Sequence, residues 1–341
     1  MAVQFVHGYR NEMGRSPNMN ARVRAVTIDR RGRVAVREVP EPPLGRREVR
    51  IAVDTSGVGS WDAEMRPEGR ELLVVPGTDG AGVVREKGPT VRRFRVGDRV
   101  YSYSYQNPKG GFHAESVAVV ENKVAPIPRG LGFRRAGAIA TTGLTALQGV
   151  DDALKVKRGE RIIVHGASGG VGSLALQFAK RRGARVLATA SGRDGLALVR
   201  RLGADAAVDG KRGNLTAAAR RFAPDGVDAV LAFVGGKSLA ACLDALKPRG
   251  GRLAYPNGVE PVPRKRKGVK VVAYDGVPGV REFQRLNRAV EGSKLKVPIP
   301  KEYPLARAAA AYEHAAGRHV AGKVVLKIRS KRRPIAAKRP G

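Results

Sequence analysis

The sequence of 341 residues carries 64 Lys and Arg against 30 Asp and Glu, which gives a formal net charge of +34, and 42% of its residues are hydrophobic. With a single cysteine, Cys242, the chain can form neither an internal disulfide nor a zinc site built from thiolates. No apolar run reaches the roughly 18 residues of a membrane span, and the first residues lack the layout of a signal peptide. We therefore expect a cytoplasmic protein without a membrane partner.

The first part of the chain is expected to be rich in β-strands. Residues 1–21 show no apolar periodicity and predict a flexible extension. From Arg22 onward, short alternating apolar patterns separated by glycine and proline predict strands. These patterns are "RVRAVTIDRRGRVAVREV", "EVRIAVDTSGVG", "GAGVVREKG", "GDRVYSY" and "HAESVAVV". The length of the chain accommodates two domains, and we assign the first to residues 22–145.

Residues 146–295 alternate between strand-like and helix-like segments. The predicted strands are 161–164, 185–190, 228–233 and 251–255, and the predicted helices start at Val171 or span 195–202 and 237–246. This alternation indicates an α/β fold with a doubly wound parallel sheet, covered by helices on both faces. Cys242 lies in one of these helices, where we expect a buried structural thiol rather than a nucleophile.

The end of the chain returns to mixed structure after about Lys294. The segment "PLARAAAAYEHAAG" predicts a helix and "GKVVLKI" predicts a last strand. Residues 331–341 are expected to form a basic tail.

A glycine-rich turn stands between the strand at 161–164 and the helix that follows it. It reads Ala167-Ser168-Gly169-Gly170-Val171-Gly172. Because glycine has no Cβ, the backbone N–H groups of such a turn can approach a diphosphate, and the positive end of the helix favours the same anion. The spacing, together with the flanking strands and helix, predicts a dinucleotide site formed by Ser168 to Gly172.

The strand at 185–190 ends in Ser-Gly-Arg instead of an acidic residue. In NAD-binding proteins an acidic side chain at this place accepts hydrogen bonds from the adenosine ribose. Ser191 can donate to a 2′-phosphate and Arg193 can pair with it, whereas a carboxylate would repel it. The sequence therefore predicts NADP(H) as the cofactor, with Ser191 and Arg193 among its ligands.

Several motifs together resemble a known family, the medium-chain dehydrogenase/reductase superfamily, in its zinc-free, quinone-oxidoreductase-like (zeta-crystallin-like) branch. They are "PGTDGAGVVREKGPTVRRFRVGDRVYSYS", "GGFHAESVAV", "TTGLTALQGV", "IIVHGASGGVGSLALQFAK", "LGAD" and "GKVVLKI". The resemblance covers most of residues 22–328. It implies a chaperonin-10-like β-rich domain over 22–145, completed by 296–330, and a Rossmann domain over 146–295. It also implies a nicotinamide site in the cleft between these domains, and pairing of two copies through an edge of the Rossmann sheet.

The resemblance also bears on metal binding. Zinc-dependent relatives hold their catalytic metal with side chains at positions that correspond here to Gly59, Thr78 and Ala138. None of these is a strong zinc ligand, and the lobe that carries four cysteines for structural zinc is absent. We therefore predict no metal site.

Further site residues follow from the loops that the resemblance places in the cleft. Candidate catalytic residues are Asp62, Tyr103 and Tyr105, because a tyrosine hydroxyl could orient or protonate an acceptor oxygen. Further candidate cofactor contacts are Thr142, Thr145, Phe233 and Asn257. The sequence departs from the branch at Gly59, where many members have Asn, and at Gly210, where many have a tyrosine beside the 2′-phosphate.

These observations predict hydride transfer from NADPH to a quinone or an α,β-unsaturated carbonyl compound. Such acceptors delocalise the developing charge, so their reduction needs a Lewis acid less than the activation of a plain alcohol does. The high positive charge keeps a nucleic-acid-associated protein or a regulatory protein with a dinucleotide fold open as alternatives, and it predicts nonspecific binding of polyanions. The basic runs that motivate the first of these are 264–270 and 327–341.

Overall fold

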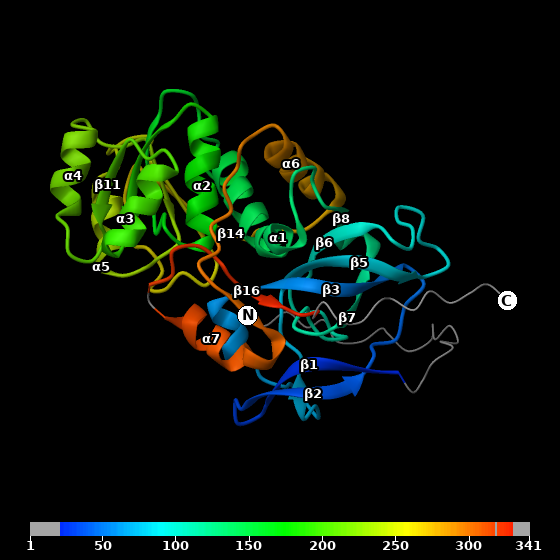
Figure 1. Ribbon diagram of the computed structural model, residues 1–341. Coiled ribbons are helices and arrows are strands. Elements are labelled where there is room, and N and C mark those ends of the chain that lie inside the picture. The colour runs from blue at the N-terminus through cyan, green and yellow to red at the C-terminus, as the bar shows by residue number, and fades with distance from the viewer. Residues whose placement is uncertain (1–20, 318, 330–341) are drawn as a thin grey trace.

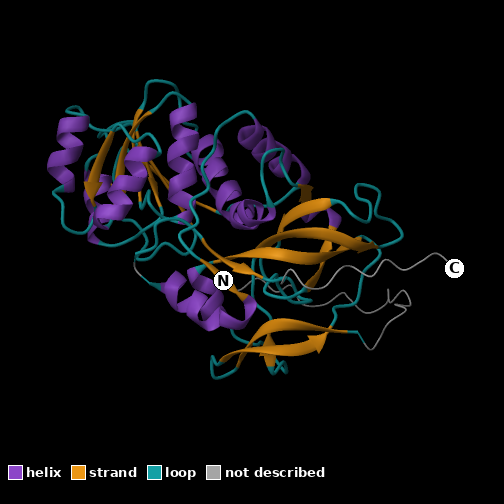
Figure 2. Cartoon of the chain, in the orientation of Figure 1, coloured by secondary structure: helices purple, strands orange, loops and turns teal. Residues whose placement is uncertain are grey.

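The computed structural model describes residues 21–317 and 319–329, which form two lobes (Figure 1). Strands dominate one lobe, and helices flank a sheet in the other (Figure 2). Residues 1–20 of the expected extension and the expected tail at 331–341 lie outside the described residues. Within the described residues, no helix has both the length and the apolarity to cross a membrane.

The β-rich lobe contains two sheets. One has the strand order β2-β1-β4, and its bounds are β1 (Arg22–Asp29), β2 (Val34–Pro40) and β4 (Leu73–Val74). The other has the order β15-β16-β3-β5-β6-β8, with β7 paired to β3. Its bounds are β3 (Glu48–Val58), β5 (Asp79–Lys87), β6 (Arg99–Tyr103), β7 (Ser116–Val120), β8 (Val124–Pro126), β15 (Glu302–Pro304) and β16 (Val324–Lys327). Because β16 pairs antiparallel with β3, the end of the chain returns to the first lobe.

The other lobe is built on a parallel sheet with the order β11-β10-β9-β12-β13-β14. Its strands are β9 (Arg161–His165), β10 (Arg185–Ala190), β11 (Ala206–Asp209), β12 (Ala229–Ala232), β13 (Arg252–Pro256) and β14 (Lys270–Tyr274). Its helices are α2 (Gly170–Arg181), α3 (Gly192–Arg201), α4 (Leu215–Phe222), α5 (Lys237–Asp244) and α6 (Val280–Glu291). The order reverses between β9 and β12, which is the arrangement of a doubly wound sheet.

Alternating side chains on β9 enter two different cores. Ile162 packs in the core that contains α2, α3 and α6, whereas Ile163 packs in the core that contains α4 and α5. Both side chains are fully buried. A central parallel strand covered on both faces accounts for the uninterrupted apolar run in the sequence, and the predicted fold class is confirmed.

The two lobes share one helix that the sequence did not predict. α1 (Phe133–Gln148) runs across the expected boundary at 145/146, and it contacts β3 and β5 of one lobe and α2 of the other. It is made largely of Ala, Gly and Thr, and every residue from Ala136 to Gln148 is buried, so this part of the helix lacks the exposed polar face of a surface helix. A Cβ on Gly137 would lie 2.5 Å from the Thr55 carbonyl oxygen, so only glycine allows the helix to pack this closely on β3.

The remaining elements are short or follow the predictions closely. α7 (Ala308–Ala316) and β16 occupy the predicted last helix and strand. α3 begins at Gly192, earlier than the predicted 195, because Ser191 adopts the extended conformation of an N-cap. Short 3-10 or π turns complete the fold: η1 (Ser60–Glu64), η2 (Glu121–Lys123), η3 (Gly149–Ala153) and η4 (Leu305–Arg307).

Candidate functional site

The glycine-rich turn joins β9 to the start of α2, as the sequence predicted. Gly166 has φ +79°, and the N-cap Gly169 is extended and provides no side-chain hydrogen bond to the helix. A Cβ on Gly172 would lie 2.2 Å from the Gly166 carbonyl oxygen, so this position admits glycine alone. The first N–H groups of α2 therefore have no side-chain cap, which is the arrangement that binds a diphosphate at a helix N-terminus.

Polar side chains on β9 and β10 hold this turn in place. Thr189 Oγ1 accepts a hydrogen bond from the Gly166 N–H at 2.9 Å and lies 2.7 Å from His165 Nδ1. His165 Nε2 lies 3.1 Å from the Ser238 hydroxyl, so both ring nitrogens have partners. Burial lowers the pKa of His165 to about 4, which keeps the imidazole neutral near pH 7.

The loops that follow the parallel strands meet at one edge of the sheet. Ser191 follows β10, Phe233 follows β12 and Asn257 follows β13, so these three predicted residues share the carboxyl edge with the glycine-rich turn. Arg193 lies exposed in the first turn of α3. The Asn257 side chain donates to Asp275 Oδ2 at 2.8 Å.

Asp209, at the end of β11, joins two of these loops and was not among the predicted site residues. One of its carboxylate oxygens accepts from the N–H groups of Lys211 and Arg212 at 2.8 and 2.9 Å. The other accepts from the Gly192 N–H at 3.0 Å. These backbone hydrogen bonds, that of Lys211 first, lower the pKa of Asp209. The Asp-Gly turn chemistry was the available signal for this residue.

Asp79 and Lys323 are buried where the two lobes meet, and both were missed among the predicted site residues. Asp79 Oδ2 accepts from the Thr141 N–H at 2.9 Å, whereas Asp79 Oδ1 and Thr141 Oγ1 have no hydrogen-bond partner among the described residues. Burial raises the pKa of Asp79, and the charge of Lys323 opposes this rise. Asp79 lies in the motif "PGTDG" and Lys323 in the motif "GKVVLKI". In each motif the charged residue stands among small and apolar residues, and this is the pattern from which a buried charge could have been predicted.

Lys323 also lies against the glycine-rich turn. Gly322 forms an isolated β-bridge with Gly169 across the two lobes. A Cβ on Gly170 would lie 3.4 Å from Lys323 Cβ and 3.4 Å from Thr142 Cγ2. The structure therefore brings Thr142 and Lys323 together with the predicted diphosphate loop.

The turn at η1 is held by a small network around Asp62. The Asp62 carboxylate accepts from the Gly59 N–H at 2.6 Å and from the Thr78 hydroxyl at 3.4 Å. Trp61 Nε1 donates to the Thr78 hydroxyl oxygen at 2.8 Å, and Lys323 Nζ lies 4.9 Å from the centroid of the indole ring. Asp62 is fully buried, so its carboxylate serves this turn.

The two candidate tyrosines differ in their surroundings. Tyr103 is half-buried at the end of β6 and pairs in register with Asp79 on β5. Burial, and secondarily the charge of Asp79, raises the pKa of Tyr103 to about 12. Tyr105 lies beyond the strand and is 54% exposed. The structure therefore places Tyr103, rather than Tyr105, beside the buried charges.

The two predicted threonines on α1 are both buried. The Thr142 hydroxyl donates to the Ala138 carbonyl oxygen at 2.6 Å. The Thr145 carbonyl oxygen accepts from the Tyr274 hydroxyl at 3.0 Å, and a Cβ on Gly276 would lie 2.4 Å from Thr145 Oγ1. The contacts of Tyr274 and Gly276 fix α1 against the end of β14 and the loop that follows it.

The residues at the positions that correspond to the zinc ligands of relatives cannot coordinate zinc in this protein. Gly59 and Ala138 have no donor side chain, and the Thr78 hydroxyl is engaged with Trp61 and Asp62. Among residues 21–317 and 319–329, no three His, Cys, Asp or Glu side chains gather closely enough to hold a metal ion. The residues present therefore do not fit a catalytic zinc.

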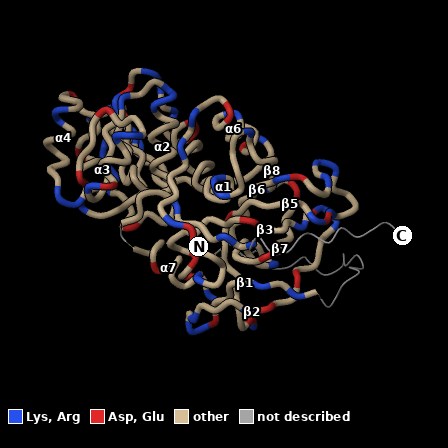
Figure 3. The backbone as a smooth tube through the Cα atoms, viewed as in Figure 1, with Lys and Arg blue, Asp and Glu red and all other residues tan. Residues whose placement is uncertain are grey.

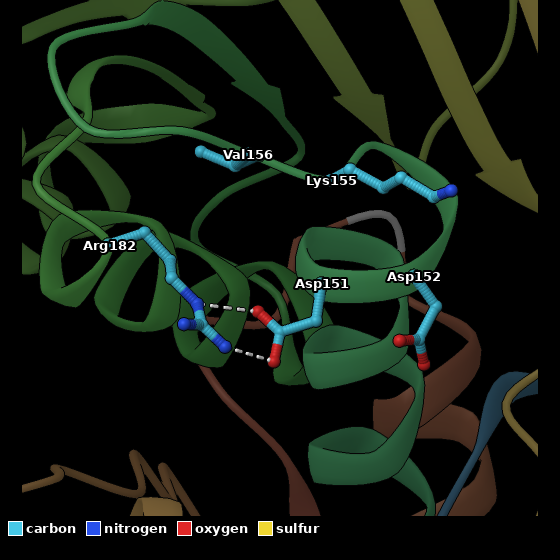
Figure 4. A pocket seen from close by; sticks show the side chains of 5 residues that line it. All are labelled: Asp151, Asp152, Lys155, Val156 and Arg182. Carbon is cyan, nitrogen blue, oxygen red and sulfur yellow. Dashed lines mark hydrogen bonds and ion pairs between the residues drawn. The ribbon is translucent and has the colours of Figure 1, made fainter.

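Figure 4 shows the side chains that line an open cavity of about 450 Å³. It is lined in part by Asp151, from η3, and by Arg182, the C-cap of α2. The Arg182 guanidinium binds the Asp151 carboxylate through two contacts of 2.8 and 2.6 Å. Because the glycine-rich turn lies at the opposite end of α2, this cavity is separate from the dinucleotide site.

Comparisons with known proteins identify the family. A family model described as "Alcohol dehydrogenase GroES-like domain" matches residues 45–129, and one described as "Zinc-binding dehydrogenase" matches residues 202–326. The quinone oxidoreductase of Rattus norvegicus is 32% identical over 307 residues, covering 85% of this chain and 92% of that protein.

Two solved structures carry different cofactor descriptions. An NAD-dependent alcohol dehydrogenase has a TM-score of 0.82 and 31% identity, covering 89% of this chain and 99% of that one. A mycobacterial protein complexed with NADPH has a TM-score of 0.78 and 28% identity, covering 90% of this chain and 100% of that one. The GroES-like domain, the parallel sheet with its glycine-rich turn and the similarity along nearly the whole chain agree. The chain belongs to the medium-chain dehydrogenase/reductase family of oxidoreductases, among its quinone-oxidoreductase-like members.

Proposed function

We propose that this oxidoreductase transfers hydride from NADPH to a quinone or an α,β-unsaturated carbonyl compound without a catalytic zinc ion. One observation carries the proposal: the stem of the buried Lys323 side chain lies beside the dinucleotide turn and its ammonium lies over the Trp61 ring, while Gly59, Thr78 and Ala138 stand at the zinc-ligand positions. Without a Lewis acid, a plain alcohol is difficult to activate. A conjugated acceptor spreads its developing charge onto a distant oxygen, which hydrogen-bond donors can stabilise.

The parallel-sheet lobe would bind the cofactor. The N–H groups from Ser168 to Gly172 would hold its diphosphate, and Ser191 and Arg193 its 2′-phosphate. Thr142, Thr145, Phe233 and Asn257 would face the nicotinamide half. When bound, NADPH supplies the hydride. The absence of a carboxylate at the end of β10 supports NADPH over NADH.

The β-rich lobe would orient the acceptor. Tyr103 keeps its proton at neutral pH because its pKa is raised to about 12, and its hydroxyl can donate a hydrogen bond to the acceptor oxygen. Lys323 would stabilise the negative charge that develops on that oxygen. Asp62 would act as a positioning residue, because its carboxylate holds the η1 turn and thereby Trp61.

Two measurements test this proposal. Calorimetry should detect NADPH binding with micromolar affinity and much weaker NADH binding. Steady-state oxidation of both nucleotides against a panel of quinones, enals and enones should show turnover with NADPH, and added zinc or a chelator should leave the rate unchanged. The absence of heat with either nucleotide would overturn the cofactor assignment. Binding without turnover on any acceptor would overturn the reductase assignment.

A further inference from the structure

A second cavity, of about 690 Å³, lies where both lobes contribute to one wall. We call it the linker groove, because the segment 293–298 that leads from α6 back to the β-rich lobe forms part of it. Residues from the loop before α1, from the start of α1 and from the ends of α3 and α6 complete the lining. The volume lies within the range of small-molecule sites, roughly 300 to 1,000 Å³.

The lining of the linker groove is strongly basic. Its cations are Arg129, Arg135, Arg201, Lys294 and Lys296. None of these side chains forms an ion pair with another described residue, although the rest of the described chain contains many such pairs. The single lining carboxylate belongs to Glu291, which accepts from the Arg129 N–H at 2.9 Å. Lys and Arg are spread over both lobes (Figure 3) and outnumber acidic residues about two to one in the whole chain, so the groove is more basic than the chain as a whole.

Arg135 is the lining cation whose position most favours a bound anion. Arg135 lies in the first turn of α1, where the helix dipole disfavours a cation. The adjacent Arg134 offsets this cost through an ion pair with Glu302 at 3.3 Å, whereas Arg135 makes none within the described residues. A bound anion would compensate both the unpaired guanidinium and the positive end of the helix.

The groove also has an apolar floor. Leu295 and Val297 from the linker segment line the cavity and are partly exposed, and they pack over the same core as the more deeply buried Leu198, Leu202 and Val290. Purely inorganic anions would leave this floor uncovered. An alkyl chain laid along it would remove apolar surface of the chain and of the floor from water, which is favourable.

From this combination we propose that the linker groove binds an amphiphilic anion, with one anionic head group on the cationic rim and an alkyl tail on the apolar floor. Long-chain carboxylates belong to this chemical class. Such a ligand would touch residues of both lobes at a place separate from the dinucleotide turn. The proposal does not depend on the identity of the cofactor or the acceptor.

Calorimetry with dodecanoate, kept below its micellar concentration, tests the proposal on the full chain. We expect one saturable site. Acetate, which lacks the tail, and dodecyl maltoside, which has the tail but no charge, should bind at least about tenfold more weakly, because each lacks one of the two contacts. Equal binding of dodecyl maltoside would refute recognition of the head group, and no saturable heat with dodecanoate would refute the site.

Two charge-matched double variants locate the binding. Arg135→Gln with Arg201→Gln removes two cations from the groove and should weaken dodecanoate binding by about tenfold or more. Arg220→Gln with Arg221→Gln removes two exposed cations from α4, outside the groove, and should leave it unchanged. All four side chains are exposed, so both variants should retain the fold, which the melting temperature checks. Equal losses in the two variants would mean that the fatty acid adsorbs to the general positive charge.

Discussion

The two lobes bring different chemistry to the place where they meet. The parallel-sheet lobe presents backbone N–H groups from the glycine-rich turn and few side chains. The β-rich lobe presents buried or half-buried side chains, among them Trp61, Asp79 and Tyr103, together with Lys323 at the entry to β16. Backbone amides recognise any diphosphate, whereas side chains distinguish one acceptor from another. Substitutions in the first lobe should therefore alter cofactor affinity, and substitutions in the second should alter turnover.

The largest effect is expected at Gly172. Its replacement by alanine places a Cβ 2.2 Å from the Gly166 carbonyl oxygen, which is backbone and cannot rotate away. We expect Gly172→Ala to abolish measurable NADPH binding in calorimetry. Gly169→Ala is the matched control, because its Cβ would meet the same oxygen at an ordinary 3.5 Å. If both variants bind NADPH equally well, the turn does not hold the diphosphate.

His165 should affect stability rather than turnover, although it lies just below the same turn. Its pKa is about 4 in the folded protein and about 6.5 in an unfolded chain, so the unfolded state binds more protons between these values. Stability is therefore lost as pH falls from about 6.5 to 4, by about 3 kcal/mol in total. Chemical denaturation across this range measures it. His165→Gln should remove most of this slope, and identical slopes would contradict the assignment.

The sequence predicted these two lobes unequally for a physical reason. Short apolar runs predict the strands β9, β10, β12 and β13, and the glycine spacing predicts the diphosphate turn. Both signals are local patterns in the sequence. The pair Asp79 and Lys323 is separated by more than 200 residues and meets only through the pairing of β16 with β3. α1 lacks an exposed polar face over Ala136 to Gln148 because both lobes bury it. Local periodicity cannot reveal contacts that depend on tertiary pairing.

A substitution of Lys323 tests whether this residue acts on the acceptor or binds the cofactor. We expect Lys323→Met to lower kcat/KM for the acceptor by about tenfold to a hundredfold, the loss of one charge-assisted hydrogen bond, while the Kd of NADPH changes little. Lys247→Met, which removes an ion pair with Asp228 in the other lobe, serves as the control and should leave kcat/KM unchanged. A rise in the Kd of NADPH that matches the fall in kcat/KM would instead assign Lys323 to the cofactor.

The smallest effect is expected at Arg193, which is exposed on the first turn of α3. Solvent screens an exposed charge, so Arg193→Gln should raise the Kd of NADPH by about tenfold, the low end for a charge-assisted contact. The Kd of NADH should not change, because NADH lacks the 2′-phosphate. Arg200→Gln, on the last turn of the same helix, removes the same charge away from the loop and should leave both constants unchanged. An equal loss of affinity for both nucleotides would show that Arg193 does not read the 2′-phosphate, and cofactor choice would then depend on Ser191 and the loop that Asp209 holds.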